Sequence, residues 1–428
     1  MIFWGGVICN LIFPRLNKIE KWIVKEGAGI NSILKLISIN LSLLLALVLF
    51  SSSITISDVQ AEPTYKENDQ VTKVMGDGEA GFREGPYDIA RIRFPRGITE
   101  DNDGNILIAD SMNQRVRIIV EKEINTYAGD PPGYDLRGFK EGGYRDGNID
   151  EARFNSPRDM VVDSNGDVYV SDSDNHVIRR MSKSDEDTGE VTTFVGAGEK
   201  GKEDARGLEA KFNTPSGMTV DDNDNIYVAD TMNQAIRKIT STGNVNTIAD
   251  GLNEPYDVAY NSETLYVSDS GAQKIYQIDL DAENDDYDLE VLAGGGEEKL
   301  PDSDYTAGDL KDGTLEEAQF NFPKGLDITK EGVILVADGW NGRVRAVFPG
   351  EGEVRTLVSE GLEGPIDVYF KEAEHENTGD LYISDMWNNI IIREEVAKKH
   401  LDPEELKKEE ESLLELLSEI FTSIIDLQ

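Results

Sequence analysis

Cysteine, histidine and basic residues are all scarce in this chain of 428 residues. The one cysteine, Cys9, leaves no partner for an intrachain disulfide, and there are three histidines. Lys and Arg number 42 against 83 Asp and Glu, a formal net charge of −41. A surface this negative repels phosphate backbones and anionic lipid head groups, which excludes nucleic acid as an expected partner. The acidity serves solubility, with loose binding of cations as the alternative.

Common catalytic signatures are missing as well. The sequence has no Gly-x-Ser-x-Gly nucleophile motif, no phosphate-binding loop and no Cys–His pair. Helix-favouring runs are absent from the middle of the chain, whereas glycine is abundant, with 40 residues. Few helices and many turns favour an all-β fold. A binding protein is therefore expected rather than an enzyme.

Residues 1–61 have the features of an export signal. An almost uncharged run at 36–56 follows several basic residues, and Val59 and Ala61 supply the small side chains that signal peptidase requires. We expect cleavage after Ala61 and a secreted or cell-envelope protein. The run is also long enough to span a bilayer, so the alternative is an uncleaved anchor, which would be the protein's contact with the membrane.

Residues 401–428 predict an amphipathic helix. Asp402 suits the N-cap and Pro403 the first turn, and Leu and Ile residues follow at spacings of three and four. The apolar stripe packs against the preceding domain or, as the alternative, mediates self-association.

Between these ends, at residues 62–400, one sequence unit recurs six times. The segment FPRGITEDNDGNILIADSMNQRVRII, which begins at Phe94, returns as FNSPRDMVVDSNGDVYVSDSDNHVIRRM and as FNTPSGMTVDDNDNIYVADTMNQAIRKI. Alternating strands are separated by turns rich in Asp, Asn and Gly, and a fourth strand such as EVTTFVG follows. The opening prolines are Pro95, Pro157, Pro215, Pro255, Pro323 and Pro365. The aspartates that close the second strands are Asp110, Asp172, Asp230, Asp269, Asp338 and Asp385.

The sixth unit lacks its fourth strand, and a matching strand stands before the first unit. QVTKVMG, at 70–76, is similar to EVTTFVG. An N-terminal strand that completes the last sheet closes the ring and removes the open edges of a linear array. The sequence therefore predicts a six-bladed β-propeller.

The units resemble the NHL-repeat family in their proline and glycine before the inner strand, their Val-Ala-Asp strand end and the following Asn and Ile-Arg. The resemblance covers about residues 70–395 and implies a six-bladed propeller. Blade four departs from the pattern at Ala272 and Tyr276. Some six-bladed relatives are zinc lyases or calcium-dependent lactonases. The histidines, His176, His375 and His400, do not occupy equivalent blade positions, which argues against zinc. A calcium-dependent hydrolase with its site in the central channel remains the alternative function.

One face of the predicted propeller carries the candidate binding residues. The turn entering each inner strand and the turn after each second strand lie at the same end. Residues after the prolines thus bring Arg96, Arg158, Tyr256 and Lys324 to a central mouth, where the cations are suited to an anionic ligand. Two residues beyond the closing aspartates stand Met112, Met232, Trp340 and Trp387. Exposed aromatic rings of this kind indicate a partner or, as the alternative, pack against the long loops between blades. We expect a protein or carbohydrate ligand on this face.

The residues that recur in every blade are assigned structural roles. The closing aspartates, with an Asn three residues later, satisfy backbone donors of the turn. Arg117, Arg179, Arg237 and Arg345 pair with carboxylates or backbone between blades. Asp101 to Gly104 resembles a calcium loop but lacks its bidentate Glu, so we interpret it as a hairpin turn. No cofactor or metal site is assigned, although calcium is possible.

Overall fold

The computed structural model describes residues 72–135, 138–182, 189–281, 287–296, 298–301, 303–372, 378–397 and 401–402. They belong to a compact unit that spans Tyr65–Gln428. The predicted export segment lies outside these residues, as does nearly all of the predicted C-terminal helix. Within the described ranges, no helix combines the length and the apolar character needed to cross a membrane.

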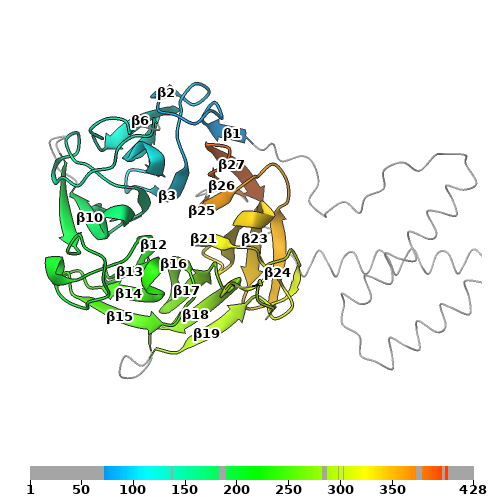
Figure 1. The fold of residues 1–428 in the computed structure, drawn as a ribbon. Coiled ribbons are helices and arrows are strands. Elements are labelled where there is room, and N and C mark those ends of the chain that lie inside the picture. Colours follow the sequence, from blue (N-terminus) through cyan, green and yellow to red (C-terminus); the bar gives the residue numbers. More distant parts are fainter. Residues whose placement is uncertain are drawn as a thin grey trace, which may run out of the picture. The chain divides into compact units, whose positions relative to one another are not determined.

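Six antiparallel sheets follow one another around a central axis, which confirms the predicted propeller (Figure 1). Blade I contains β3 (Pro95–Glu100), β4 (Ile106–Asp110), β5 (Arg115–Val120) and β6 (Glu123–Ala128). Blade II contains β8 (Pro157–Val162), β9 (Val168–Asp172), β10 (Val177–Ser182) and β11 (Glu190–Val195). Blade III contains β12 (Pro215–Val220), β13 (Ile226–Asp230), β14 (Ala235–Ile239) and β15 (Val245–Asp250).

The second half of the ring repeats the same order. Blade IV contains β16 (Pro255–Asn261), β17 (Thr264–Asp269), β18 (Lys274–Asp279) and β19 (Leu289–Ala293). Blade V contains β21 (Pro323–Ile328), β22 (Ile334–Asp338), β23 (Arg343–Phe348) and β24 (Glu353–Val358). Blade VI contains β25 (Pro365–Glu372), β26 (Thr378–Asp385) and β27 (Ile390–Ala397). Two-residue strands that the sequence did not predict extend blades I, II and V: β2 (Gly85–Pro86), β7 (Gly147–Asn148) and β20 (Gly313–Thr314).

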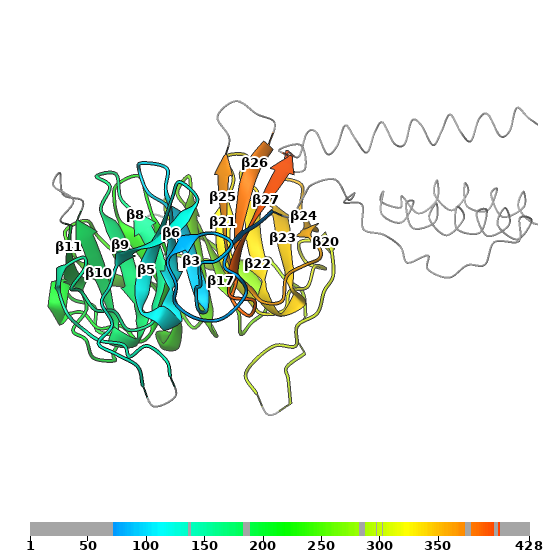
Figure 2. The ribbon, with the colours of Figure 1, turned by 90° about the horizontal axis from the view of Figure 1, so that it is seen from above.

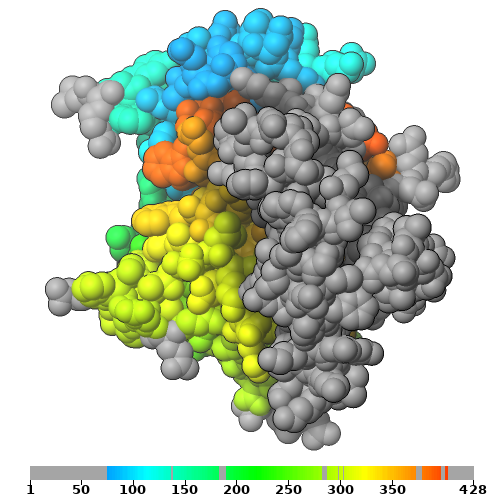
Figure 3. Space-filling view, turned by 90° about the vertical axis from the view of Figure 1, so that its right-hand side faces the viewer, coloured from blue at the N-terminus to red at the C-terminus, as the bar shows by residue number. Residues whose placement is uncertain are grey.

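The ring closes as the sequence predicted. The N-terminal strand β1 (Thr72–Met75) pairs antiparallel with β27, with Thr72 opposite Arg393. Blue β1 therefore lies beside orange β27 in Figure 1, and blade I contacts blade VI in the space-filling view of Figure 3. Because β1 occupies the outer edge of blade VI, the two ends of the repeat array hold each other.

Apolar contacts between neighbouring blades form the core. The second strands ILIAD, VYVSD, IYVAD and ILVAD are buried along their whole length, since each is flanked by strands on both edges and by blades on both faces. Buried side chains form one cluster at each of the six junctions between blades in the described chain. The inner strands line the central channel with the side chains that do not enter these clusters, among them Asp159, Asp257 and Asp367.

Three-residue 3-10 turns follow the second strands of four blades at the end of the channel that we call the mouth face. These turns are η1 (Ser111–Asn113), η2 (Ser173–Asn175), η4 (Thr231–Asn233) and η6 (Gly339–Asn341). The connector that leads from blade IV to blade V reaches this face, because Thr306 N donates to Gly271 O at 2.9 Å. Figure 2 shows this connector and the one between blades I and II projecting on the same side of the propeller.

Candidate functional site

Strand register brings the predicted residues to one end of the channel. Each opening proline is paired with the closing aspartate of its own blade, as in Pro157 opposite Asp172 and Pro323 opposite Asp338. The residue after the proline and the turn after the aspartate therefore share the mouth face in every blade. This register confirms the premise on which the candidate residues were chosen.

A buried network around each closing aspartate holds the mouth-face turns. In blade II, Asp172 Oδ1 accepts a 2.7 Å hydrogen bond from Asn155 N, and Asp172 Oδ2 accepts 2.8 Å bonds from Asn175 Nδ2 and Arg179 Nη1. Arg179 also pairs with Asp146 of the connector at 2.5 Å. Burial raises the pKa of Asp172 to about 6 although Arg179 opposes this shift. The structural interpretation of the recurrent Asp and Asn is thus confirmed.

The recurrent arginines pair with a carboxylate and with backbone of the connectors between blades, as the sequence predicted. Each of the other three, Arg117, Arg237 and Arg345, pairs with the closing aspartate of its own blade and also donates to backbone carbonyls of the preceding connector. Blade IV has Tyr276 at this position, and there Asp269 accepts backbone N–H groups of Asn253, Glu254 and Ala272 instead. Backbone donors thus replace the missing arginine in blade IV.

Three cations and a tyrosine from four inner strands meet at the mouth, and we call Arg96, Arg158 and Lys324 the cation ring. Arg96 Nη1 donates a 2.8 Å hydrogen bond to Tyr256 Oη, which joins blade I to the opposite blade IV. Lys324 Nζ lies 4.3 Å from the centroid of the Tyr256 ring and 3.7 Å from Glu254 Oε1. The structure therefore brings together all four residues that the sequence assigned to the mouth centre.

Arg158 differs from the other two cations because its guanidinium has no hydrogen bond or ion pair within the described part of the chain. Its Nε is buried without a partner, as is the Nε of Arg96. Burial and the nearby Arg96 lower the pKa of Arg158 to about 10. Burial also lowers the pKa of Lys324 to about 8; Glu254 opposes the shift, whereas Arg96 and Arg158 add to it. Like charges thus crowd one another in a poorly solvated place, which is typical of anion-binding and other functional sites.

Aromatic rings stand next to the cation ring. Trp340 is 68% exposed and stacks on Phe322, with ring centroids 4.4 Å apart. Tyr305, from the connector into blade V, also contacts Phe322, with ring centroids 5.7 Å apart. We call Trp340, Phe322 and Tyr305 the aromatic platform. It adjoins the cations because Lys324 Nζ lies 5.5 Å from the Phe322 centroid.

The other predicted mouth residues are more dispersed. Trp387 is 57% exposed and meets Phe94 edge-on, with centroids 5.8 Å apart. Met232 is 59% exposed in the blade III turn, whereas Met112 is half-buried in the blade I turn. Sequence reasoning missed Phe94 and Phe322, although both precede an opening proline and that position could have been compared across the blades.

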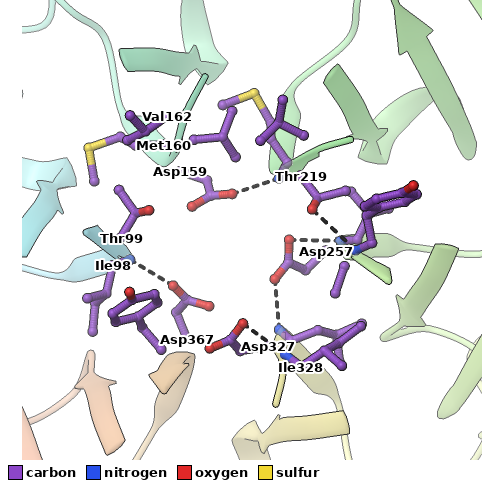
Figure 4. A pocket seen from close by; sticks show the side chains of 18 of the residues that line it. Ile98, Thr99, Asp159, Met160, Val162, Thr219, Asp257, Asp327, Ile328 and Asp367 are labelled. Carbon is purple, nitrogen blue, oxygen red and sulfur yellow. Dashed lines mark hydrogen bonds between the residues drawn. The ribbon is translucent and has the colours of Figure 1, made fainter. Parts of the chain in front are cut away.

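A second ring of polar side chains lies one residue deeper in the channel. Asp159, Asp257 and Asp367, which we call the channel aspartates, come from blades II, IV and VI and point into a cavity of about 330 Å³ (Figure 4). The equivalent residues of blades I, III and V are Gly97, Gly217 and Gly325. A Cβ atom on these glycines would lie 2.7, 2.6 and 2.6 Å from the Cα of the neighbouring channel aspartate. Glycine in alternate blades therefore makes room for the carboxylates.

Each channel aspartate ties its blade to the next but remains hard to ionise. Oδ2 accepts a backbone N–H from the following blade: Asp159 from Met218 at 2.6 Å, Asp257 from Leu326 at 2.8 Å and Asp367 from Ile98 at 2.8 Å. Burial raises the pKa of Asp159 to about 7. Burial and the other channel aspartates raise the pKa values of Asp257 and Asp367 well above the ordinary value. Sequence reasoning missed this ring, although the alternation of Pro-x-Asp and Pro-x-Gly is visible in the repeats.

Polar residues with other candidate roles have structural contacts. Asp101 Oδ1 accepts the N–H groups of Asp103 and Asn105 at 2.9 Å, in the hairpin turn that the sequence predicted. His176 Nδ1 accepts Thr214 N at 3.1 Å and links blades II and III. In the ranges that the structure describes, no group of three or more His, Cys, Asp or Glu side chains is placed to hold a metal ion.

Comparisons with known proteins agree with the repeat pattern. A model described as NHL repeat matches residues 154–180 and 212–239, and one described as Teneurin NHL domain matches 236–363. The chain is 28% identical over 329 residues to Protein SUPPRESSOR OF QUENCHING 1, chloroplastic, of Arabidopsis thaliana, which covers 69% of this chain and 29% of that protein. It is 25% identical over 250 residues to NHL repeat-containing protein 2 of Gallus gallus, covering 50% of this chain and 32% of that protein. The chain thus spans about a third or less of the length of these relatives.

A solved structure shows the same fold. An auxiliary nutrient binding protein from Bacteroides ovatus superposes with a TM-score of 0.56 over 77% of each chain at 15% identity. Identity this low supports the architecture alone. From the repeat matches, the NHL-repeat relatives and the six closed blades, we conclude that the chain contains NHL repeats and folds as a six-bladed β-propeller.

Proposed function

We propose that the protein is an exported binding module that holds its ligand on the mouth face, without catalysing a reaction. The observation that carries this proposal is the aromatic platform with the cation ring beside it. Trp340 exposes 68% of its surface although its ring is stacked on Phe322, and Trp387 exposes 57% in the adjacent blade. Large rings held in place but left open to solvent are typical of binding surfaces, where they contribute contact area at a small entropic cost.

The alternative of a calcium-dependent hydrolase has less support from the channel. Its acidic residues are the expected ligands, but an Oδ2 of each channel aspartate accepts a backbone N–H of the next blade. No group of three acidic or histidine side chains in the described chain is arranged around a metal position. Turnover of lactones or phenyl esters that depends on added calcium would favour the hydrolase over the binding module.

Tryptophan emission provides a direct test of the binding module. Trp4 and Trp22 are the other two tryptophans, so a full-length chain with Trp4→Phe and Trp22→Phe reports on Trp340 and Trp387 alone. We expect the emission to change on titration with at least one class in a panel of neutral oligosaccharides, oligouronates, and acidic and basic peptides. Trp340→Ala in the same background should weaken that binding about tenfold or more while the melting temperature stays within a few degrees.

Two results would contradict the proposal. No binding to any probe at millimolar concentration would remove its basis. Early unfolding of both Trp340→Ala and Trp387→Ala would mean that these rings stabilise the fold rather than meet a ligand. Val291→Ala is a suitable control, since Val291 is 49% exposed on β19, the outer strand of blade IV, away from the candidate binding residues.

A further inference from the structure

We propose that the ligand is an acidic saccharide whose carboxylate binds the cation ring while its sugar ring lies against the aromatic platform. This inference rests on the proposed binding function and specifies the chemistry of the same face. Four observations carry it: the unpaired guanidinium of Arg158, the imbalance of charge at the mouth, the net negative charge of the chain, and the position of the platform.

Arg158 provides the anchor. In the described chain its guanidinium contacts no acceptor, and its Nε is buried without a partner. Most polar groups in folded proteins have a partner, so a guanidinium at the channel mouth with no acceptor on any of its nitrogens indicates a group supplied from outside. A guanidinium presents two parallel N–H donors that match the planar carboxylate.

The remaining charges at the mouth leave a net deficit of anions. Lys324 has Glu254 at 3.7 Å, and Arg96 donates to the neutral Tyr256 hydroxyl. Asp174 and Glu254 attract Arg158 from farther away, without forming an ion pair with it. Three cations therefore share one close carboxylate, and their mutual repulsion would be relieved by a ligand with one negative charge.

The acidity of the chain limits how much negative charge the ligand brings, whereas the channel aspartates below the mouth have raised pKa values and add little fixed charge. Asp159 directly follows Arg158 on β8, and Asp257 directly follows Tyr256 on β16. The whole chain also carries a net charge of −41. Each charge beyond the first on one ligand group meets the repulsion of this net charge, so a monoanionic carboxylate is favoured over a phosphate dianion.

The platform accounts for the saccharide. Lys324 Nζ lies 5.5 Å from the Phe322 centroid, and Phe322 in turn lies 4.4 Å from Trp340. The charged and aromatic surfaces are thus within the reach of one or two sugar units. A sugar ring has an apolar C–H face that packs on aromatic rings, as well as hydroxyl groups that remain in water.

Matched ligands and matched variants test the inference. Isothermal titration of the full-length chain uses trigalacturonate, its methyl ester and a neutral trisaccharide. We expect trigalacturonate to bind and the methyl ester, which lacks the charge, to bind roughly ten- to hundredfold more weakly. Arg158→Gln should give a similar loss without lowering the melting temperature, because Arg158 has no protein partner to lose. Arg158→Lys should recover part of the affinity, because it keeps the positive charge but lacks the two parallel N–H donors of the guanidinium.

Lys330→Gln is the control for charge. Lys330 stands in the same blade as Lys324 but at the hairpin on the opposite face, with its side chain 80% exposed, so this variant should bind as the wild type does. Equal affinity for acid and ester, or an unchanged affinity in Arg158→Gln, would overturn the inference but leave the binding module in place. Binding of acidic peptides alone would also overturn it. A chain that binds no probe at all would contradict both proposals.

Discussion

Replacing Asp159 by Asn should make the protein more stable at neutral and alkaline pH. Asp159 lies in the channel beside Asp257 and Asp367, and burial raises its pKa to about 7. Its one bond to the next blade is an accepted N–H from Met218 at 2.6 Å. The amide oxygen of Asn is able to accept the same N–H, so the substitution removes the charge and keeps the link between blades.

The sign follows from proton binding in the two states. An unfolded aspartate titrates near pH 3.9, whereas the folded one titrates near pH 7. Between these values the native state binds more protons than the unfolded state, so the free energy of unfolding decreases as the pH rises through this window. The stabilising protonated form is fully present below about pH 4 and is lost by about pH 8. A carboxylate held in a favourable ion pair shows the opposite pH dependence, because its contribution to stability increases as the pH rises.

The magnitude comes from the size of the shift. A change of about three pKa units at 1.36 kcal/mol each is an upper bound of about 4 kcal/mol at pH 8, and about 2 kcal/mol at pH 5. For a propeller of this length, 4 kcal/mol corresponds to a rise of about 6 °C in the melting temperature. The gain of Asp159→Asn over the wild type should therefore grow between pH 5 and pH 8.

Thermal unfolding followed by circular dichroism at pH 5, 6, 7 and 8 measures this effect. Asp304→Asn serves as the control, since its side chain is 97% exposed and the change in net charge is the same. The reasoning is refuted if Asp159→Asn gains no more than Asp304→Asn at pH 8, or if its gain does not depend on pH.

Two other predictions concern the contacts that hold the blades. Gly217→Ala should lower the free energy of unfolding by about 1–3 kcal/mol, because the new Cβ would lie 2.6 Å from Asp257 Cα. Gly350→Ala should be nearly neutral, since no atom lies within 4 Å of its Cβ. Equal effects of the two variants in urea unfolding would contradict the packing argument. Arg179→Met should cost about 3–5 kcal/mol, since it leaves Asp172 buried without its 2.8 Å partner. The control is Arg180→Met in the next position, where the arginine side chain is 44% exposed, and it should lower the free energy of unfolding by less than about 1 kcal/mol. Similar losses of stability in both variants would refute a special role for the buried pair.

Much of the site could be predicted from the sequence because each blade repeats one register. The position after the opening proline falls at the mouth in every blade, and so Arg96, Arg158, Tyr256 and Lys324 could be chosen without coordinates. The aromatic platform was found only in part, since Trp340 was chosen for its place in the turn while Phe322 and Tyr305 come from other segments. Their proximity depends on how the connector into blade V folds back over blade IV, which no local pattern encodes.

The sequence by itself determined the number of blades and the closure of the ring. Hairpin pairing is local, so six similar units and the displaced strand QVTKVMG were enough to predict β1 beside β27. Only the tertiary structure decided what the channel contains. The crowding of Arg158 against Arg96, and of Asp159 against Asp257 and Asp367, arises between blades that are distant in the sequence. Such distances depend on the closed ring as a whole, because each inner strand meets the others only across the axis.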